Sequence, residues 1–276
     1  MLKKTPKMLL FPALALALVL GGCTSTGSAD PGGNSSTATE SHLTKILKTK
    51  KIKIAVLPDA PPWGIINASG EYEGLDVNLA KALAESLGAE LEFVNTNDAN
   101  RIPLLQTDKV DAVMAALTAT NVRAQSVEMS RPYAAGGSLV LVPADSSIKS
   151  YADLAGKNVA VSRGSSQQTM MEADFPDTTL TPFDTVADAI QALKSNKVDA
   201  MPTDGSVAKG LAADDSGLRV LAGPRLAVSV VSVGVKPGDQ LWLNYLNTFI
   251  KNYNNSNAGN ASYLKWLGEE IPAVVQ

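Results

Sequence analysis

The sequence contains one cysteine and one histidine in 276 residues. The cysteine is Cys23, so no disulfide can form within the chain. The histidine is His42, so a Ser-His-Asp triad, a histidine-based zinc site and a Cys-His pair all lack the residues that they need. The sequence also has no glycine-rich nucleotide-binding loop. Only carboxylate or lysine chemistry stays open, and we expect no catalytic residue, no cofactor and no metal.

The sequence has no excess of positive charge either. Its formal net charge is -3. Three of its lysines, Lys3, Lys4 and Lys7, lie in the N-terminal segment, and the rest of the chain is therefore more acidic still. This balance argues against nucleic acid as a partner.

The N-terminal segment, residues 1–22, has the pattern of a secretory signal. Its lysines precede an apolar stretch from Leu9 to Leu20, which is too short to span a bilayer as a stable helix. Two glycines and Cys23 follow, an order that resembles the lipobox of bacterial lipoproteins, where the cysteine thiol receives a diacylglycerol. An ordinary signal peptide with an incidental cysteine is the alternative. We expect an exported protein that lipidated Cys23 anchors to a membrane, in the periplasm or at the cell surface.

Residues 23–41 consist mainly of Ser, Thr, Gly, Asn and Pro. A segment with so few apolar side chains cannot bury enough surface to offset its ordering entropy, so we expect a flexible tether. The folded part then covers residues 42–276, which is long enough for one sizeable core or two modest lobes.

An internal repeat divides the folded part. The pattern L-x-x-x-K-V-D-A occurs from Leu105 to Ala112 and again from Leu193 to Ala200. In each copy the end of an amphipathic helix precedes a short apolar strand. The repeat therefore predicts two α/β units of similar build.

Hydrophobic periodicity predicts the elements of the two units. In the first unit it predicts strands at 52–57, 91–94 and 110–117, a helix at 75–87 that ends at Gly88, and a short helix capped by Asp98. In the second unit it predicts strands at 158–161, 179–181 and 198–201, a helix that opens at 163–166, and a helix capped by Thr185. Extended runs at 132–142 and 228–235 connect the units, and two C-terminal helices between 242 and 267 return to the first. The βαβαβ order predicts parallel sheets with helices on their faces.

Residues of opposite charge follow the two copies of the repeat. Thr118 and Arg123 come after the first copy, and Asp204 comes after the second. In open α/β sheets ligands bind beyond the carboxyl ends of the strands. Two such lobes facing each other would hold a small zwitterion between an arginine and an aspartate, because a guanidinium offers two parallel donors to a carboxylate. A surface arginine and a turn aspartate are the alternatives.

The folded part resembles the bacterial extracellular solute-binding proteins of family 3, the receptors of polar amino acid ABC importers. The resemblance covers Ile52 to Gly268 and is carried by nine motifs in order: D-A-P-P-W-G at 59–64, E-G-L-D-V-N-L-A at 73–80, N-R-I-P-L-L-Q at 100–106, K-V-D-A at 109–112, T-x-x-R at 120–123, E-M-S-R-P-Y at 128–133, D-L-A-G-K-N-V-A-V at 153–161, K-V-D-A at 197–200 and K-W-L-G at 265–268.

The resemblance implies a type II periplasmic binding protein-like α/β fold, in which two lobes are joined by two crossover strands with a ligand cleft between them. We expect lobe 1 to comprise residues 42–136 and 230–276, and lobe 2 residues 137–229. The resemblance further implies closure of the lobes about a hinge and an ABC permease as the partner. We expect a monomer.

Carried over residue by residue, the resemblance makes Arg123 the clamp for the ligand carboxylate and Asp204 the acceptor for the ligand ammonium. Ala116 and Thr118 supply a carbonyl and a hydroxyl or amide donor to the same two groups, or else pack only at the strand end. Ser165 and Ser166 open a helix whose free amides favour an anion, and a plain helix cap is the alternative.

The side chain of the ligand is less well defined by the sequence. Trp63 forms a wall of the pocket, or else belongs to the core. Many family members have an aspartate where this chain has Leu57, and an aromatic residue where it has Ala60; without that aspartate a cationic side chain has no evident partner. Arg101 and Arg163 are spare cations, and the N-R-I-P motif around Arg101 resembles the acidic amino acid subgroup. We expect glutamate or aspartate as the ligand, with a neutral polar amino acid as the alternative.

Two other functions stay open on the sequence. The resemblance includes cyclohexadienyl dehydratases of the same fold, for which Glu172 is the first general acid to consider. A sensor subunit in chemotaxis or signalling would use the same lobe closure.

Overall fold

The computed structural model describes residues 40–276. The signal segment, Cys23 and the expected tether up to residue 39 lie outside the described residues. Within the described part, no helix is long and apolar enough to cross a membrane.

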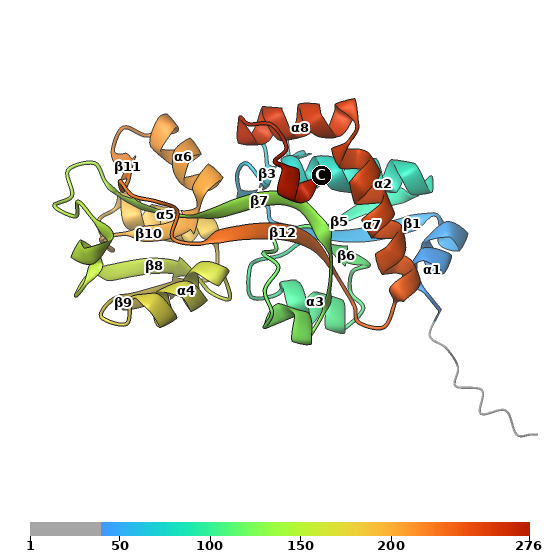
Figure 1. Cartoon of the computed structure of the whole chain (residues 1–276), viewed down its shortest axis with the longest axis horizontal. Coiled ribbons are helices and arrows are strands. Elements are labelled where there is room, and N and C mark those ends of the chain that lie inside the picture. Colours follow the sequence, from blue (N-terminus) through green and yellow to red (C-terminus); the bar gives the residue numbers. More distant parts are fainter. Residues whose placement is uncertain (1–39) are drawn as a thin grey trace, which may run out of the picture. The chain divides into compact units, whose positions relative to one another are not determined.

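Lobe 1 is built from the first part of the folded chain and its C-terminal end (Figure 1). Its helices are α1 (His42–Thr49), α2 (Leu75–Leu87), α3 (Arg101–Gln106), α7 (Gln240–Asn254) and α8 (Asn257–Leu267), with short 3-10 turns η1 (Arg123–Gln125) and η3 (Ala273–Val275). Its strands are β1 (Lys51–Val56), β2 (Asp59–Ala60), β3 (Gly64–Ile66), β4 (Tyr72–Glu73), β5 (Glu90–Asn95) and β6 (Ala112–Val113).

Lobe 2 is built from the middle of the chain. Its helices are α4 (Ser166–Asp174), α5 (Val186–Lys194) and α6 (Gly205–Asp214), preceded by the 3-10 turn η2 (Tyr151–Leu154). Its strands are β8 (Asn158–Ser162), β9 (Thr179–Phe183), β10 (Met201–Asp204) and β11 (Leu218–Val220).

Two long antiparallel strands, β7 (Glu128–Pro143) and β12 (Val228–Val235), run from one lobe to the other, as Figure 1 shows. They lie inside one sheet of order β10-β7-β12-β6-β1-β5, so the main sheet continues through the connection between the lobes. This is the α/β architecture of two lobes joined by two crossover strands that the sequence predicts. The exact residues at which one lobe gives way to the other stay a prediction.

The repeated K-V-D-A motif has the same structural role in both lobes. In lobe 1 the carboxylate of Asp111 accepts a 2.8 Å hydrogen bond from the amide of Lys53, and the Asp111 amide donates to the Lys53 carbonyl at 2.9 Å. In lobe 2 the carboxylate of Asp199 accepts from the amide of Asn158 at 2.8 Å, and its own amide donates back at 2.7 Å. Each aspartate therefore ties the end of the repeat to the first parallel strand of its lobe.

Most elements agree with their predictions, and three differ. The expected strand 110–117 is reduced to β6, because Ala116 has a left-handed φ of 48° that ends the extended backbone. The expected strand 198–201 gives way to β10, which begins at Met201 and pairs with β7. Asp98 does not cap α3, whose N-cap position is Asn100. The remaining predicted strands and helices are confirmed within a few residues.

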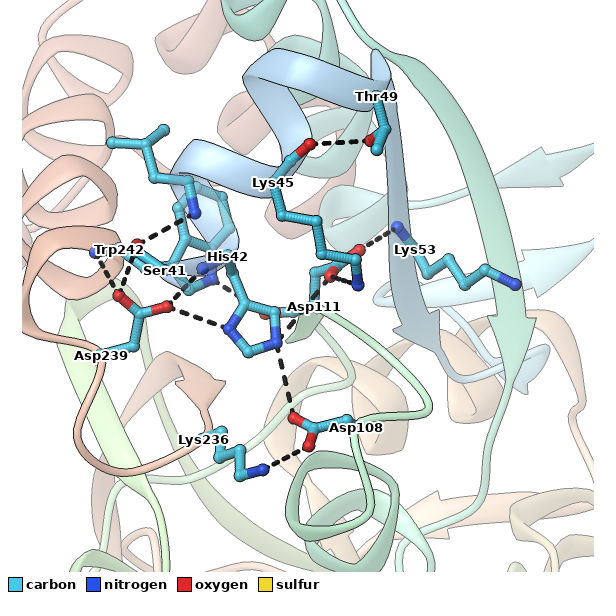
Figure 2. Close-up of polar contacts among 11 residues, drawn as sticks. Ser41, His42, Lys45, Thr49, Lys53, Asp108, Asp111, Lys236, Asp239 and Trp242 are labelled. Carbon is cyan, nitrogen blue, oxygen red and sulfur yellow. Dashed lines mark hydrogen bonds and ion pairs between the residues drawn. The ribbon is translucent and has the colours of Figure 1, made fainter. Parts of the chain in front are cut away.

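The N-terminal helix α1, which the periodicity did not predict, is fixed to the fold by Asp239 (Figure 2). Ser41, the last residue of the expected tether, caps α1, and its hydroxyl donates to Asp239 at 2.6 Å. The amide of His42 donates to the same carboxylate at 2.6 Å, and the His42 Nδ1 atom lies 2.9 Å from it. Asp239 also caps α7 by accepting from the Trp242 amide at 3.1 Å. One carboxylate therefore holds the N-termini of two helices together.

Candidate functional site

A hollow of about 50 Å³ lies where the two lobes meet. Six of the predicted site residues line it: Trp63, Arg101, Ala116, Thr118, Ser166 and Asp204. The first four come from lobe 1 and the last two from lobe 2. Apolar side chains of Leu57, Val207 and Val231 complete much of the wall.

Arg123 lies in an adjoining cavity of about 790 Å³ rather than in the small hollow. Asp98, Thr118 and Ser166 line both spaces, so the two hollows meet at these residues. The Arg123 guanidinium donates to the carbonyl of Thr118 at 2.8 Å and to the carbonyl of Gly164, across the lobe boundary, at 3.1 Å. These bonds use two of its five N–H groups. Burial lowers the pKa of Arg123 to about 10, so the group stays cationic at neutral pH.

Asp204 is positioned by the helix that follows it. One carboxylate oxygen caps α6, accepting from the amide of Ser206 at 2.9 Å and from its hydroxyl at 2.6 Å. The other oxygen lies against Gly136 of β7, where a β-carbon would come within 2.7 Å of it. Strand β7 therefore needs a glycine at position 136 to leave room for this carboxylate.

A buried aspartate, Asp76, holds the backbone at Ala116. Asp76, in the first turn of α2, is fully buried and accepts from the Ala116 amide at 2.7 Å and from the Tyr133 hydroxyl at 2.5 Å. Burial raises the pKa of Asp76 to about 7, although both hydrogen bonds act to lower it. The unusual backbone at Ala116 is held in place by this contact.

Arg101 is buried and already has a charge partner. Only 3% of its side chain is exposed, and its Nη2 atom lies 2.8 Å from the carboxylate of Asp98. Its Nη1 atom donates to the carbonyls of Ala115 at 2.8 Å and Ala116 at 3.3 Å, and its Nε atom donates to the Asp98 carbonyl at 3.2 Å. Every guanidinium nitrogen has a partner, so Arg101 is not the spare cation that the sequence suggested. The second candidate, Arg163, forms an exposed ion pair with Asp184 and lines neither hollow.

The two serines at the start of α4, Ser165 and Ser166, make different contacts. Ser165 is the N-cap, and its hydroxyl accepts from the Gln168 amide at 3.1 Å. Ser166 lies 3.3 Å from Thr118, hydroxyl to hydroxyl, across the boundary between the lobes. Ser165 therefore acts as a helix cap, and Ser166 is the serine that lines the hollow.

Three residues position the site in ways that the sequence did not indicate: Asp76 and Gly136, which had no role assigned, and Asp98, which was expected only to cap a helix. Asp76 gave no clear signal, because an acidic residue in the first turn of a helix is common and the helix dipole accounts for it. Asp98 was given the wrong role, that of a helix cap, because its pairing with Arg101 depends on the burial of both groups. The requirement at position 136 depends on Asp204, which is distant in sequence.

The residue suggested for dehydratase chemistry, Glu172, lies apart from both hollows. Glu172 is exposed on α4, accepts a hydrogen bond from Gln168 at 2.9 Å and lines neither hollow. Among the described residues, no group of three histidine, cysteine or acidic side chains is placed to hold a metal ion. The arrangement offers opposite charges, hydroxyls and carbonyls to a small polar molecule between two lobes.

The fold and the hollow together define a two-lobed ligand-binding protein of the type II periplasmic class. The family model for bacterial extracellular solute-binding proteins, family 3, matches residues 52–269, and the chain belongs to this family. It is similar to the ABC transporter glutamine-binding protein GlnH of Bacillus subtilis, with 31% identity over 94% of this chain and 95% of that protein. It is also similar to the glutamine-binding protein of Geobacillus stearothermophilus, with 33% identity over 76% of this chain and 84% of that protein.

Solved structures of the same class resemble the fold. The ancestral amino acid-binding protein AncCDT-1, a precursor of cyclohexadienyl dehydratase, is 32% identical, has a TM-score of 0.77, and is matched over 82% of this chain and 99% of that one. A solute receptor for L-cysteine from Neisseria gonorrhoeae is 29% identical, also with a TM-score of 0.77, over 82% of this chain and 93% of that one.

Proposed function

We propose that this chain is the amino acid-binding protein of an ABC importer and that it captures a free polar amino acid between its lobes. The observation that carries the proposal is the placement of Arg123 and Asp204 in two hollows that meet at Asp98, Thr118 and Ser166. A cation and an anion on opposite sides of this junction match the two charged ends of an amino acid.

Each charged end of the ligand has a set of partners in this proposal. Arg123 receives the carboxylate, because its guanidinium is held by two carbonyls and still has donors left. The free N-terminal amides of α4 add to this at Ser166. Asp204 and the carbonyl of Ala116 receive the ammonium.

We further propose a neutral side chain for the ligand, such as that of glutamine. An acidic side chain needs a cationic partner when it is buried. Arg101 is the one cation that lines the small hollow, and Asp98 already neutralises it. Two glutamine-binding relatives agree with this choice. The expectation of glutamate or aspartate as the ligand stays a prediction. The test below decides between it and a neutral side chain.

The lobes must separate for the ligand to enter. The space of about 50 Å³ beside Asp204 is much smaller than the adjoining cavity of about 790 Å³ that Arg123 lines. The contacts that must open are those of Arg123 with Gly164 and of Thr118 with Ser166. A ligand that bonds to both lobes favours the closed form, which is the form that the permease is proposed to receive.

The test is a thermal-shift screen of the folded part, residues 40–276, against the twenty amino acids, followed by titration calorimetry. We expect glutamine to raise the melting temperature most. Arg123→Ala is expected to weaken binding by ~30-fold or more, because removing one partner of a buried charge pair costs ~2–5 kcal/mol. Arg163→Ala, which removes an exposed arginine, is the matched control and should bind normally. If no amino acid raises the melting temperature, the proposal fails; if glutamate binds best, only the choice of side chain fails.

The dehydratase alternative draws on AncCDT-1, an amino acid-binding protein that is a precursor of cyclohexadienyl dehydratase. Against it, the carboxylate suggested as general acid, Glu172, is exposed outside the hollow. Incubation with prephenate or arogenate separates the two functions, because formation of phenylpyruvate or phenylalanine would establish an enzyme.

We also propose that Cys23 carries a lipid and that the folded part is attached through residues 23–41. The support is the order of lysines, apolar stretch, glycines and cysteine in the sequence. Metabolic labelling with a fatty acid should mark the wild-type protein and not Cys23→Ser. Labelling that persists in the variant would exclude this anchor.

A further inference from the structure

The chain has three tryptophans, and their indole N–H groups differ in whether they have a hydrogen-bond acceptor. The indole of Trp242 donates to the carbonyl of Asp111 at 2.8 Å. The indole nitrogens of Trp63 and Trp266 are buried and have no acceptor among the residues that the structure describes. Leaving a buried donor without an acceptor is unfavourable, so each of these two groups calls for an explanation.

Trp63 and Trp266 differ in where they lie. Trp63 is 1% exposed and lines the small hollow together with Asp204 and Arg101. Trp266 is partly exposed on α8, has the Lys265 ammonium 4.6 Å from its ring centre and does not line that hollow. Trp63 therefore belongs to the wall of the proposed site, and Trp266 lies outside it.

Trp63 is also held rigidly. It sits in the turn between β2 and β3, where its amide donates to the carbonyl of Ala60 at 2.9 Å. Its carbonyl accepts from the amide of Asp76 in the first turn of α2 at 3.0 Å. A donor fixed in this way loses little entropy when it binds an acceptor.

We infer that the indole N–H of Trp63 donates a hydrogen bond to an oxygen in the side chain of the ligand and selects amino acids that carry such an oxygen. This inference rests on the proposed function. In that proposal Arg123 takes one charged end of the ligand and Asp204 the other, while the nitrogens of Arg101 are all engaged. Trp63 then supplies the donor that distinguishes a carboxamide from a hydrocarbon chain of similar length.

The experiment compares glutamine with norleucine, whose side chain has a similar length and no oxygen. Both are titrated by calorimetry into the wild-type protein, Trp63→Phe and Trp266→Phe. Phenylalanine keeps an aromatic ring and removes the N–H. We expect wild type to prefer glutamine and Trp63→Phe to lose about tenfold of that preference, as one hydrogen bond of ~1.4 kcal/mol requires. Trp266→Phe, the matched control, should keep the preference.

A second readout does not depend on the folding of Trp63→Phe. Indole nitrogen-15 labelling gives one NMR signal for each tryptophan, and Trp266→Phe identifies its own. In wild type the other two signals belong to Trp63 and Trp242. One of them should move downfield when glutamine is added and should not move with norleucine.

The outcomes separate the inference from the proposed function. If glutamine binds wild type and Trp63→Phe with the same preference over norleucine, or if neither remaining indole signal moves, the inference is overturned and the amino acid receptor stands. The inference is also overturned if the amino acid that binds wild type most tightly has a hydrocarbon side chain. If no amino acid binds wild type, the proposed function fails and the inference fails with it.

Discussion

The hydroxyl of Tyr133 donates a 2.5 Å hydrogen bond to the buried carboxylate of Asp76. Tyr133 belongs to the crossover strand β7, and Asp76 begins helix α2 of lobe 1. The same carboxylate accepts from the Ala116 amide at 2.7 Å. One buried group thus links a strand that connects the lobes to a backbone carbonyl proposed to bind the ligand.

The raised pKa of Asp76 predicts that stability falls as pH rises. Between about pH 4 and 7 the folded protein keeps a proton on Asp76 that the unfolded chain has released, since burial raises the folded pKa to about 7. The contribution is therefore fully present below pH 4 and is lost as pH rises through 7. Asp76→Asn cannot titrate and should remove this part of the slope. Urea unfolding at pH 4.5, 6 and 7.5 measures the difference between variant and wild type.

Asp76→Leu serves as the contrasting variant at the same position. It leaves the Ala116 amide and the Tyr133 hydroxyl without their acceptor, at ~1–3 kcal/mol for each group. We expect it to unfold more easily than Asp76→Asn at every pH. Parallel pH profiles for wild type and Asp76→Asn would contradict the assignment.

Gly136→Ala should weaken ligand binding and lower stability by no more than the loss of the Asp204 cap on α6, ~0.5–2 kcal/mol. A β-carbon at this position would come within 2.7 Å of the Asp204 carboxylate, which can turn away because it is the end of a flexible side chain. The turned carboxylate no longer meets the ligand ammonium, so we expect ~10-fold weaker binding, equivalent to ~1.4 kcal/mol. Calorimetry and urea unfolding measure the two effects separately.

Gly210→Ala is the control for this substitution. Gly210 lies in α6 with nothing within 4 Å of an added β-carbon, so alanine should stabilise the helix by up to ~1 kcal/mol and leave binding unchanged. If Gly136→Ala binds as tightly as Gly210→Ala, Asp204 is not the ammonium partner.

Asp98→Asn should shift ligand preference towards glutamate. The change removes the charge that neutralises Arg101 and leaves a buried guanidinium available to an acidic side chain. We expect the ratio of glutamine to glutamate affinity to fall by ~10-fold or more and the protein to lose ~3 kcal/mol of stability, as for other broken buried pairs.

Asp184→Asn is the matched control for Asp98→Asn, because it breaks the exposed ion pair with Arg163. An exposed pair contributes little, so neither stability nor preference should change by a measurable amount. An unchanged ratio in Asp98→Asn would mean that Arg101 does not contact the side chain of the ligand.

Asp239→Asn should loosen helix α1. Its pKa is lowered because the hydrogen bonds from Ser41, His42 and Trp242 outweigh the effect of partial burial (Figure 2). The contribution is present above about pH 4 and is lost as pH falls through the lowered folded value. At neutral pH asparagine still caps α7, but it has one acceptor oxygen in place of two for the bonds from Ser41 and His42, so we expect a loss of ~1 kcal/mol and faster hydrogen exchange at the amides of α1.

Asp214→Asn, at an exposed position on α6, is the control for Asp239→Asn. It should leave the exchange rates of α1 unchanged. If Asp239→Asn also leaves them unchanged, α1 is held mainly by the burial of Leu43 and Ile46 rather than by this carboxylate.

Local sequence patterns determined the elements and the plan of the fold. Helices such as α2, with Leu75, Leu79, Leu83 and Leu87 on one face and Gly88 at the end, follow from periodicity and capping, which depend on near neighbours only. The K-V-D-A repeat indicated two units, and both copies occupy the same structural position. Thr118 and Asp204 follow predicted strands, and this position predicted that they lie at the cleft, because parallel strands end at a common edge.

Tertiary contacts decided the functions of individual charges. The sequence did not distinguish a free Arg101 from a paired one, because the answer depends on the burial of Asp98 and of two carbonyls beside it. The backbone turn at Ala116 depends on Asp76, forty positions earlier in the chain. The placement of Arg123 in an adjoining cavity likewise depends on Gly164 of the other lobe.

The sequence by itself thus determined two α/β units, which follow from patterns that near neighbours impose, and its resemblance to the family pointed to six residues that line the small hollow. Only the tertiary structure decided which charges are already neutralised and which donors are left unpaired. The reason is physical: the energy of a charge or a buried N–H is set by the groups within a few ångströms of it, and folding alone brings those groups together.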